Sequence, residues 1–272
     1  MRPEYPAPEQ PGLAGLLRAW RARAGQRSGR GRPLAQVEVA AGAGMSERWY
    51  RDLERGAIPR LDARTLGALA DALRLCPDER ATVFLYAAGG EPFPPVTPER
   101  GAGELAPLRR LLAQHEPEPA FLTDHVWNVL DHNAAAAHWF PWISEPRANV
   151  ARWGLTDARA REQMADWPRH GRAFLAMLRF AMAQYPREER LRALLDEALA
   201  DPECRRIWDA GPVVIAHRDG HDVRLRLPQV APEPVEVVAR VLLPTGWPGL
   251  RLTLLESAPN ATPLDRQIIA GR

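Results

Sequence analysis

The sequence predicts two domains: an all-α N-terminal domain, followed by an α+β C-terminal domain with an antiparallel sheet. Three observations support this prediction. Apolar residues repeat at helical spacing up to residue 88, a segment rich in proline and glycine follows at 89–107, and apolar and polar residues alternate as in strands beyond residue 208. With 272 residues, of which 46% are hydrophobic, the chain is long enough to form two hydrophobic cores.

The helices of the first domain are predicted from apolar residues at positions i, i+3, i+4 and i+7. In 13–23 this pattern begins at Leu13 and ends at Trp20. The same spacing predicts two further helices, at 64–75 and 78–88. All regular structure in the first domain is therefore expected to be helical.

Between these helices lies the segment QVEVAAGAGMSERWYRDLERG, residues 36–56, which fits the spacing of a helix-turn-helix. Its fifth residue, Ala40, is small where two helices cross closely, and its ninth, Gly44, allows the positive φ of a sharp turn. Ser46 then caps the second helix. The inward positions of this template are all apolar: Val39, Met45, Tyr50 and Leu53.

The outer face of the second helix is predicted to contact DNA, because the inward positions leave its polar side chains outside. These are Ser46, Glu47, Arg48, Arg51, Asp52 and Arg55, to which we add Gln36 at the start of the motif. Residues 12–60 hold ten arginines and four acidic residues, a local charge of +6 in a chain of net charge +2. This basic end suits a polyanion such as DNA. The alternative is an ordinary two-helix hairpin with a solvated charged face.

Two pairs of arginines are expected to play different roles on DNA. Arg48 and Arg51 lie three residues apart on the exposed helix face and can reach base edges in the major groove. Arg30 and Arg32 lie among glycines in the segment RSGRGRP, with no fixed direction, which suits contact with phosphates. An ordinary solvated loop is the alternative for this segment.

Composition sets the expected domain boundaries. An N-terminal tail covers 1–11, the DNA-binding domain 12–88, a linker 89–107, the second domain 108–258 and a C-terminal tail 259–272. The linker is predicted from its proline and glycine content and its lack of helical periodicity.

The second domain combines helices with strands. Strand-forming β-branched and aromatic residues mix in 119–130. The segment VVIAHRDGHDVRLRL is predicted to form a hairpin on an Asp219-Gly220 turn, and VEVVARVLL and LRLTLLES add two more strands. Helical periodicity predicts helices at 133–140, 170–184 and 187–200.

Aromatic and apolar residues of the second domain suit a binding cavity, since small-molecule pockets are mostly apolar. Several tryptophans fall close together in sequence, and an apolar stripe at helical spacing follows. Ordinary core packing is the alternative for each of these residues. The predicted ligand-binding residues are Trp127, Asn133, Trp139, Phe140, Trp142, Trp153, Phe174, Leu178, Met182 and Trp208.

Other kinds of site have little support in the sequence. Cys76 and Cys204 follow no disulfide or metal-ligand spacing, which indicates a reduced, cytoplasmic setting. We find no signal peptide and no apolar run long enough for a spanning helix. His217 and His221 flank the predicted turn and would need further ligands to hold a metal. No phosphate loop, nucleophile elbow or HExxH motif is present, so neither an enzyme nor a cofactor is expected.

These segments resemble a known family. The run from LLRAWRARAG through the helix-turn-helix to LGALADALRLCPDERATVFLYAAG is similar to the DNA-binding half of the MmyB-like transcription regulators, in the XRE-like repressor superfamily. PAFLTDHVWNVLDHNAAAAHWF and RAFLAMLRFAMAQYPREERLRALLDEALADPECRRIWDAG resemble that family's ligand-binding domain. The resemblance covers about 12–257. It implies a PAS-like sheet with helices on it, a pocket for a fatty acid or similar lipophilic molecule, and a bacterial regulator.

We therefore expect a transcriptional regulator that binds a palindromic double-stranded operator as a homodimer, because two recognition helices about 34 Å apart reach successive major grooves. Two alternatives remain. The second domain could bind a partner protein and no small molecule, in which case an exposed apolar patch is expected. It could also be an enzyme-like metal or hydrolase domain fused to DNA binding.

Overall fold

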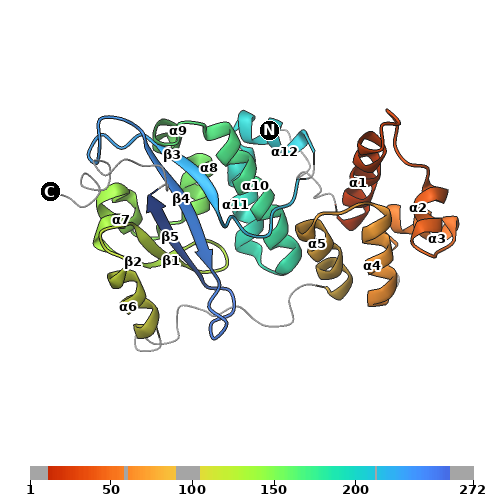
Figure 1. Ribbon diagram of the computed structural model, residues 1–272, viewed down its shortest axis with the longest axis horizontal. Coiled ribbons are helices and arrows are strands. Elements are labelled where there is room, and N and C mark those ends of the chain that lie inside the picture. Colours follow the sequence, from red (N-terminus) through yellow and green to blue (C-terminus); the bar gives the residue numbers. More distant parts are fainter. Residues whose placement is uncertain (1–11, 58–60, 90–104, 212, 258–272) are drawn as a thin grey trace, which may run out of the picture. The chain divides into compact units, whose positions relative to one another are not determined.

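The computed structural model describes residues 12–57, 61–89, 105–211 and 213–257 (Figure 1). These residues divide into two compact units. The first unit contains the described residues up to 89, together with 178–188 and 206–216. The second contains the remaining described residues from 105 onward. Two short segments that the sequence assigned to the second domain thus belong to the first unit.

The regular structure up to residue 89 is helical throughout the described residues, as the sequence predicted. The five helices are α1 (Leu13–Arg27), α2 (Gln36–Gly42), α3 (Glu47–Glu54), α4 (Ala63–Ala72) and α5 (Pro77–Ala88). They bury one apolar cluster, in which Leu16, Leu17, Trp20, Tyr50 and Leu69 are at most 1% exposed. Because α1 contributes residues from successive turns to this cluster, the helical periodicity read from the sequence is also the periodicity of burial.

Two glycines near the α2–α3 turn have different physical roles. Gly44 has a φ of 67°, a left-handed conformation that costs a glycine little and most other residues more. Gly42 lies at the end of α2, where an added Cβ would be 3.0 Å from the Cβ of Ala72 in α4. The first glycine permits the turn, and the second permits α2 to approach α4 closely.

From residue 105 onward the chain forms both helices and strands. The helices are α6 (Ala106–Gln114), α7 (Ala134–Trp139), η1 (Pro141–Ser144), α8 (Val150–Thr156), α9 (Ala158–Gln163), α10 (Trp167–Gln184), α11 (Glu189–Leu199) and α12 (Pro202–Asp209). The strands are β1 (Ala120–Thr123), β2 (Val129–His132), β3 (His221–Leu225), β4 (Val235–Leu242) and β5 (Arg251–Ser257). Their order in the sheet is β2-β1-β5-β4-β3, and all neighbours are antiparallel. The α+β architecture with an antiparallel sheet is confirmed.

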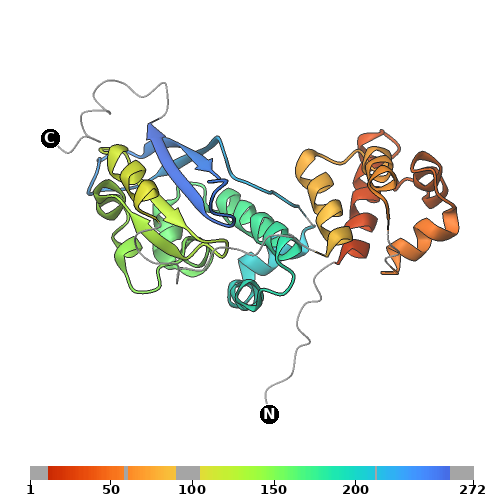
Figure 2. The same cartoon turned by 90° about the horizontal axis from the view of Figure 1, so that it is seen from below.

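The register of the sheet explains how α6 packs on it. Leu122 in β1 lies opposite Leu252 in β5, so both side chains point to the same face. Leu108 and Leu112 of α6 bury themselves against these two leucines. At the other end, Met164 after α9 forms an isolated bridge with Leu225 in β3. Figure 1 shows α9 beside this strand, and Figure 2 shows the same sheet from below.

The predicted hairpin on Asp219-Gly220 is wrong. β3 pairs with β4, with Leu225 opposite Val235, and the residues before Asp219 form no strand. Val214, expected in the first strand of the hairpin, is buried in the apolar cluster of the first unit. The Asp219 carboxylate instead accepts a hydrogen bond from the backbone N–H of Val241, 3.1 Å away. The turn at Asp219-Gly220 is present, but burial of Val214 elsewhere outweighed pairing of the two segments that flank it.

The structure also contains helices that the sequence analysis did not predict. These are α6, η1, α8, α9 and α12. All five span only four to nine residues, one to two and a half turns, which is too short to show a clear apolar period. The predicted helices at 133–140, 170–184 and 187–200 correspond to α7, α10 and α11.

Candidate nucleic-acid interface and ligand-sensing residues

The N-terminus of α3 is fixed by Ser46. Its hydroxyl oxygen accepts a hydrogen bond from the backbone N–H of Trp49, 3.2 Å away, as an N-cap does. Tyr50 and Leu53 are 0% and 1% exposed, which fixes the inner face of the helix. The opposite face, which the sequence analysis assigned to DNA, is thereby turned outward.

Charged side chains on this outer face differ in whether they form ion pairs. Arg51 pairs with Glu47 at 2.6 Å, one helical turn away, and Arg55 lies 3.6 Å from Asp52. Arg48 is exposed and forms no ion pair among the described residues. The guanidinium of Arg48 can therefore bind DNA without first breaking an ion pair with a carboxylate.

Trp49 is a surface residue that the sequence analysis missed. Its side chain is 38% exposed on α3, next to Arg48. A large aromatic residue on this face can contact base edges or thymine methyl groups in the major groove. The available signal was its absence from the apolar positions of the helix-turn-helix template.

Gln36 has a different environment from the one expected. Its side-chain amide donates to Glu54 Oε2 at 2.7 Å, and Arg21 binds the same carboxylate. Glu54 is only 4% exposed. Burial raises the pKa of this carboxyl, but the hydrogen bonds from Arg21 and Gln36 outweigh burial and lower it below its usual value. Gln36 thus helps to join α2 to α3 inside the motif.

The two arginines of the glycine-rich loop also differ. Arg30 pairs with Glu38 in α2, which corrects the expectation that it has no fixed direction. The pKa of Glu38 is lowered by Arg30 and by the backbone N–H of Ala35. Arg32 is exposed and has no ion pair among the described residues. In each predicted pair of DNA-binding arginines, one member therefore forms an ion pair with a carboxylate, and the other forms none among the described residues.

Four predicted ligand-binding residues form an aromatic cluster in the second unit. The rings of Trp142 and Trp153 stack with centroids 4.5 Å apart, and Phe140 lies 6.1 Å from Trp153 in an edge-on arrangement. Trp139 lies 6.3 Å from Phe140. All four are at least nine-tenths buried. These residues are close in the chain: Trp139 ends α7, Phe140 connects it to η1, which contains Trp142, and α8 contains Trp153.

A cavity of about 580 Å³ borders this cluster. Trp142 and Trp153 line one side of it, and the rest of its lining is largely polar, with the charged side chains of Glu145, Arg147, Arg152, Asp157 and Arg159. Its volume lies within the range of small-molecule sites. The indole N–H groups of both tryptophans are buried without a hydrogen-bond partner in the described part of the chain. Buried donors of this kind are rare in native proteins.

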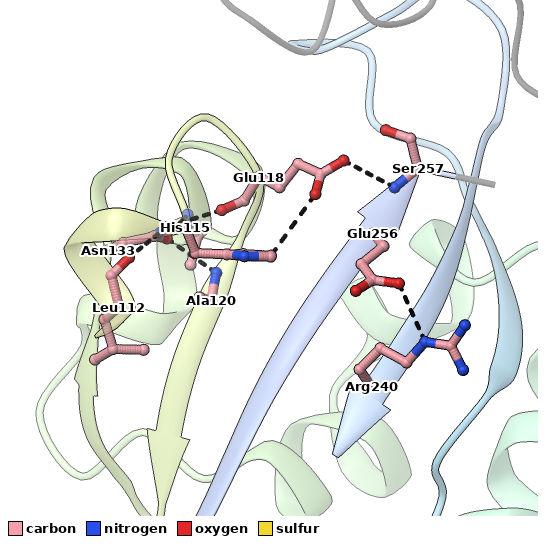
Figure 3. Close-up of polar contacts among 9 residues, drawn as sticks. Leu112, His115, Glu118, Ala120, Asn133, Arg240, Glu256 and Ser257 are labelled. Carbon is pink, nitrogen blue, oxygen red and sulfur yellow. Dashed lines mark hydrogen bonds and ion pairs between the residues drawn. The ribbon is translucent and has the colours of Figure 1, made fainter. Parts of the chain in front are cut away.

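Asn133, one of the predicted ligand-binding residues, makes four hydrogen bonds within its own domain. Its side-chain oxygen accepts from the backbone N–H groups of Ala120 and Ala136, and its amide donates to the carbonyl oxygens of Leu112 and Glu118 (Figure 3). The four distances are 3.0, 2.9, 3.3 and 2.8 Å, respectively. These bonds use the full capacity of the amide. Asn133 thus caps α7 and ties it to β1 and the end of α6.

The other predicted ligand residues are distributed between the units. Trp127 lies under the guanidinium of Arg251, 4.8 Å from its ring centroid, and Phe174 belongs to the same unit. Leu178, Met182 and Trp208 belong to the first unit. Of the predicted set, Trp142 and Trp153 line the cavity described above.

Two observations concern other kinds of site. Among the described residues, no group of three or more His, Cys, Asp or Glu side chains is placed to hold a metal ion. Within the same part of the chain, no helix has both the length and the apolar character needed to cross a membrane.

Comparison with known families agrees with both halves of the chain. Residues 13–83 match the family described as helix-turn-helix domain. Residues 106–268 match the family described as MmyB-like transcription regulator ligand binding domain. No curated protein matches the chain significantly.

Proposed function

The chain belongs to the MmyB-like transcription regulators, and from this premise we propose that α3 reads a palindromic operator in a homodimer while the second unit senses a lipophilic molecule such as a fatty acid. As a regulator of transcription it would act on DNA in the bacterial cytoplasm. DNA binding and a ligand-binding type of domain follow from the family. The operator, the ligand and the homodimer are the proposal.

Operator reading by α3 is supported most directly by Arg48 and Trp49, which project from a capped helix whose inner face is buried. Arginine pairs with guanine through two parallel hydrogen bonds, and an aromatic side chain contacts thymine methyl groups. A single helix reads only a few base pairs, which is why we expect a homodimer with two such helices about 34 Å apart.

Lipophilic sensing is supported by the aromatic cluster and the cavity beside it. Stacked, buried tryptophans offer a large apolar surface.

A protein-binding role for the second unit has one observation in its favour. Leu242 and Leu243, at the end of β4, are 50% and 46% exposed. Adjacent exposed leucines at a strand end suit contact with another chain, including the second copy that the homodimer requires.

The test begins with operators selected from random DNA by the purified full-length protein. Binding to the selected duplex is then measured against a scrambled duplex, with and without fatty acids of several chain lengths. A selected half-site repeated in inverted orientation, with affinity that changes on adding fatty acid, is the expected result. Sedimentation as a monomer on the operator would exclude the homodimer, and affinity unmoved by every fatty acid would exclude the sensing role.

A further inference from the structure

The long helix α10 belongs to both compact units. Its residues up to Met177 are part of the second unit, and those from Leu178 to its end at Gln184 are part of the first. Every residue from 173 to 183 is buried, and all of them except Arg179 are apolar. Because close-packed interiors transmit strain, a shift at one end of this helix is expected to reach the other end.

In the second unit, α10 packs closely on α8 at Gly154. The indole N–H of Trp167 donates to the carbonyl oxygen of Gly154 at 2.8 Å. A Cβ added at Gly154 would lie 2.5 Å from Cε2 of Phe174, so only glycine allows this approach. The preceding residue, Trp153, lines the cavity described above. Two consecutive residues of α8 therefore join the cavity wall to α10.

In the first unit, the second half of α10 contributes to the core of the helix-turn-helix. Phe180 is 6% exposed and belongs to the same apolar cluster as Tyr50 and Leu53, the inward residues of α3. Val214, 4% exposed, belongs to it as well. The core beneath α3 is therefore completed by residues more than a hundred positions further along the chain.

The segment 206–216 fastens α10 to the helices of the first unit. Arg179 donates to the backbone carbonyl oxygens of Trp208 and Val213 at 3.2 and 2.9 Å, and its guanidinium lies 3.6 Å from the ring centroid of Trp208. The backbone N–H of Ala216 donates to a carboxylate oxygen of Asp78 in α5 at 3.1 Å. Hydrogen bonds as well as apolar packing thus hold this end of α10 in the first unit.

We propose that α10 is the element through which a change at the cavity wall in α8 reaches the core beneath α3. The route runs from Gly154 in α8 through Phe174 and Phe180 in α10. This inference rests on the proposed function, in which one domain senses and the other reads DNA. Coupling between two sites is reciprocal, so operator binding must affect α8 as strongly as a change in α8 affects operator binding. The coupling can therefore be tested from the DNA side, with the operator duplex as the probe.

The test measures amide hydrogen exchange by mass spectrometry in the full-length protein, with and without the selected operator duplex. The duplex should slow exchange in α3, and it should also slow exchange in α8 by about fivefold or more, the lower end of typical coupling between sites. Exchange in α6 should not change, because the apolar cluster that holds α6 on the sheet contains no described residue of α8 or α10. The helix α6 is thus an internal control within the second unit.

Two variants test the route itself. Phe174→Leu removes the ring that packs at Gly154, and it should keep the slowing in α3 but lose the slowing in α8. Leu112→Val is the control, since it also removes buried apolar volume from the second unit but lies in α6, and it should keep both effects. The comparison of α8 with α6 in the wild type decides the question even where Phe174→Leu does not fold.

Three results would overturn the coupling through α10. The first is slowing confined to the first unit, and the second is equal slowing in α8 and α6, which indicates general stabilisation by DNA. The third is slowing in α8 that survives Phe174→Leu. An α3 that exchanges equally fast with and without the duplex is a separate result: it removes operator reading by α3, whereas the comparison of α8 with α6 still decides on the coupling.

Discussion

Arg21 in α1 holds Glu54 at the end of α3 through two hydrogen bonds, from Nε to Oε1 at 2.6 Å and from Nη2 to Oε2 at 3.0 Å. A third N–H group of Arg21 donates to the backbone carbonyl of Leu34 at 2.8 Å. Gln36 donates to the same carboxylate. One buried ion pair thus joins the helix before the helix-turn-helix to both of its helices.

Replacing Glu54 with glutamine should destabilise the first unit by about 3 kcal/mol, because the partly buried guanidinium of Arg21 loses the carboxylate that compensates its charge. Glu47→Gln is the matched control, since it removes a pair whose two side chains are both over 40% exposed and should cost less than about 1 kcal/mol. Urea unfolding followed by circular dichroism measures both. Equal losses would show that the Arg21–Glu54 pair has no special structural role.

Arg48→Ala should lower operator affinity by roughly 1–3 kcal/mol and leave binding to a scrambled duplex nearly unchanged, because an arginine on a base edge discriminates between sequences. Arg51→Ala should act in the same direction but less strongly, since Arg51 must first leave Glu47. Competition binding with the two duplexes measures both variants. Equal losses on operator and scrambled DNA would reassign α3 to phosphate contact.

Arg32→Ala should weaken binding to both duplexes and reduce the slope of log affinity against log salt by about one unit, as expected for a lost phosphate contact. Arg30→Ala should change the slope less, because Arg30 is paired with Glu38. Titrations at several salt concentrations give both slopes. An unchanged slope for Arg32→Ala would make this loop ordinary solvated surface.

Acidification should destabilise the fold through His170. Burial, with Arg218, Arg169 and His221 adding to it and Asp166 opposing it, lowers the pKa of His170 to about 4. Because this lies below the unfolded value of about 6.5, the unfolded chain takes up the proton first. Stability is therefore lost as the pH falls from about 6.5 towards about 4.

The effect is measured as the difference in unfolding free energy between pH 7 and pH 4.5. His170→Gln should lose less stability over this interval than the wild type, by roughly 2 kcal/mol. Parallel losses in the two proteins would mean that His170 is protonated in the folded state at pH 4.5.

Asn133→Ala should destabilise the second unit by about 2–3 kcal/mol, because it leaves two buried backbone N–H groups and two carbonyls without their partner. Asp131→Ala, which removes a partly exposed pair with Arg109, should cost less than about 1 kcal/mol. Thermal unfolding compares the two. A stable Asn133→Ala protein that no longer binds fatty acid would restore the ligand-contact role.

The helix-turn-helix could be predicted from the sequence because its determinants are local. Ser46 caps α3 from three residues before Trp49, and Gly44 takes its left-handed conformation within the turn itself. The inward residues Tyr50 and Leu53 follow the period of one short helix. Such interactions join residues a few positions apart, so they can be predicted from the spacing of residue types along the sequence.

The candidate site was predictable only in part. The sequence named Arg48 and Arg51 as outward residues, but which of them is tied to a carboxylate depends on side-chain conformation. It named Asn133 as a ligand residue, whereas in the structure its amide is consumed by backbone groups that lie up to 21 residues away. Residue type alone does not separate a polar group that binds a ligand from one that completes the fold.

The sequence by itself determined the helical first domain, the turn, the cap and the strand-forming character of the C-terminal segments. Only the tertiary structure decided their partners: β1 lies beside β5, Val214 joins the first unit's core instead of a hairpin, and the guanidinium of Arg218 contacts His170. The physical reason is that strand pairing and burial depend on the relative free energies of alternative partners, and these partners are distant in sequence. The strand pairing predicted around Asp219-Gly220 is outweighed because distant contacts bury more apolar surface.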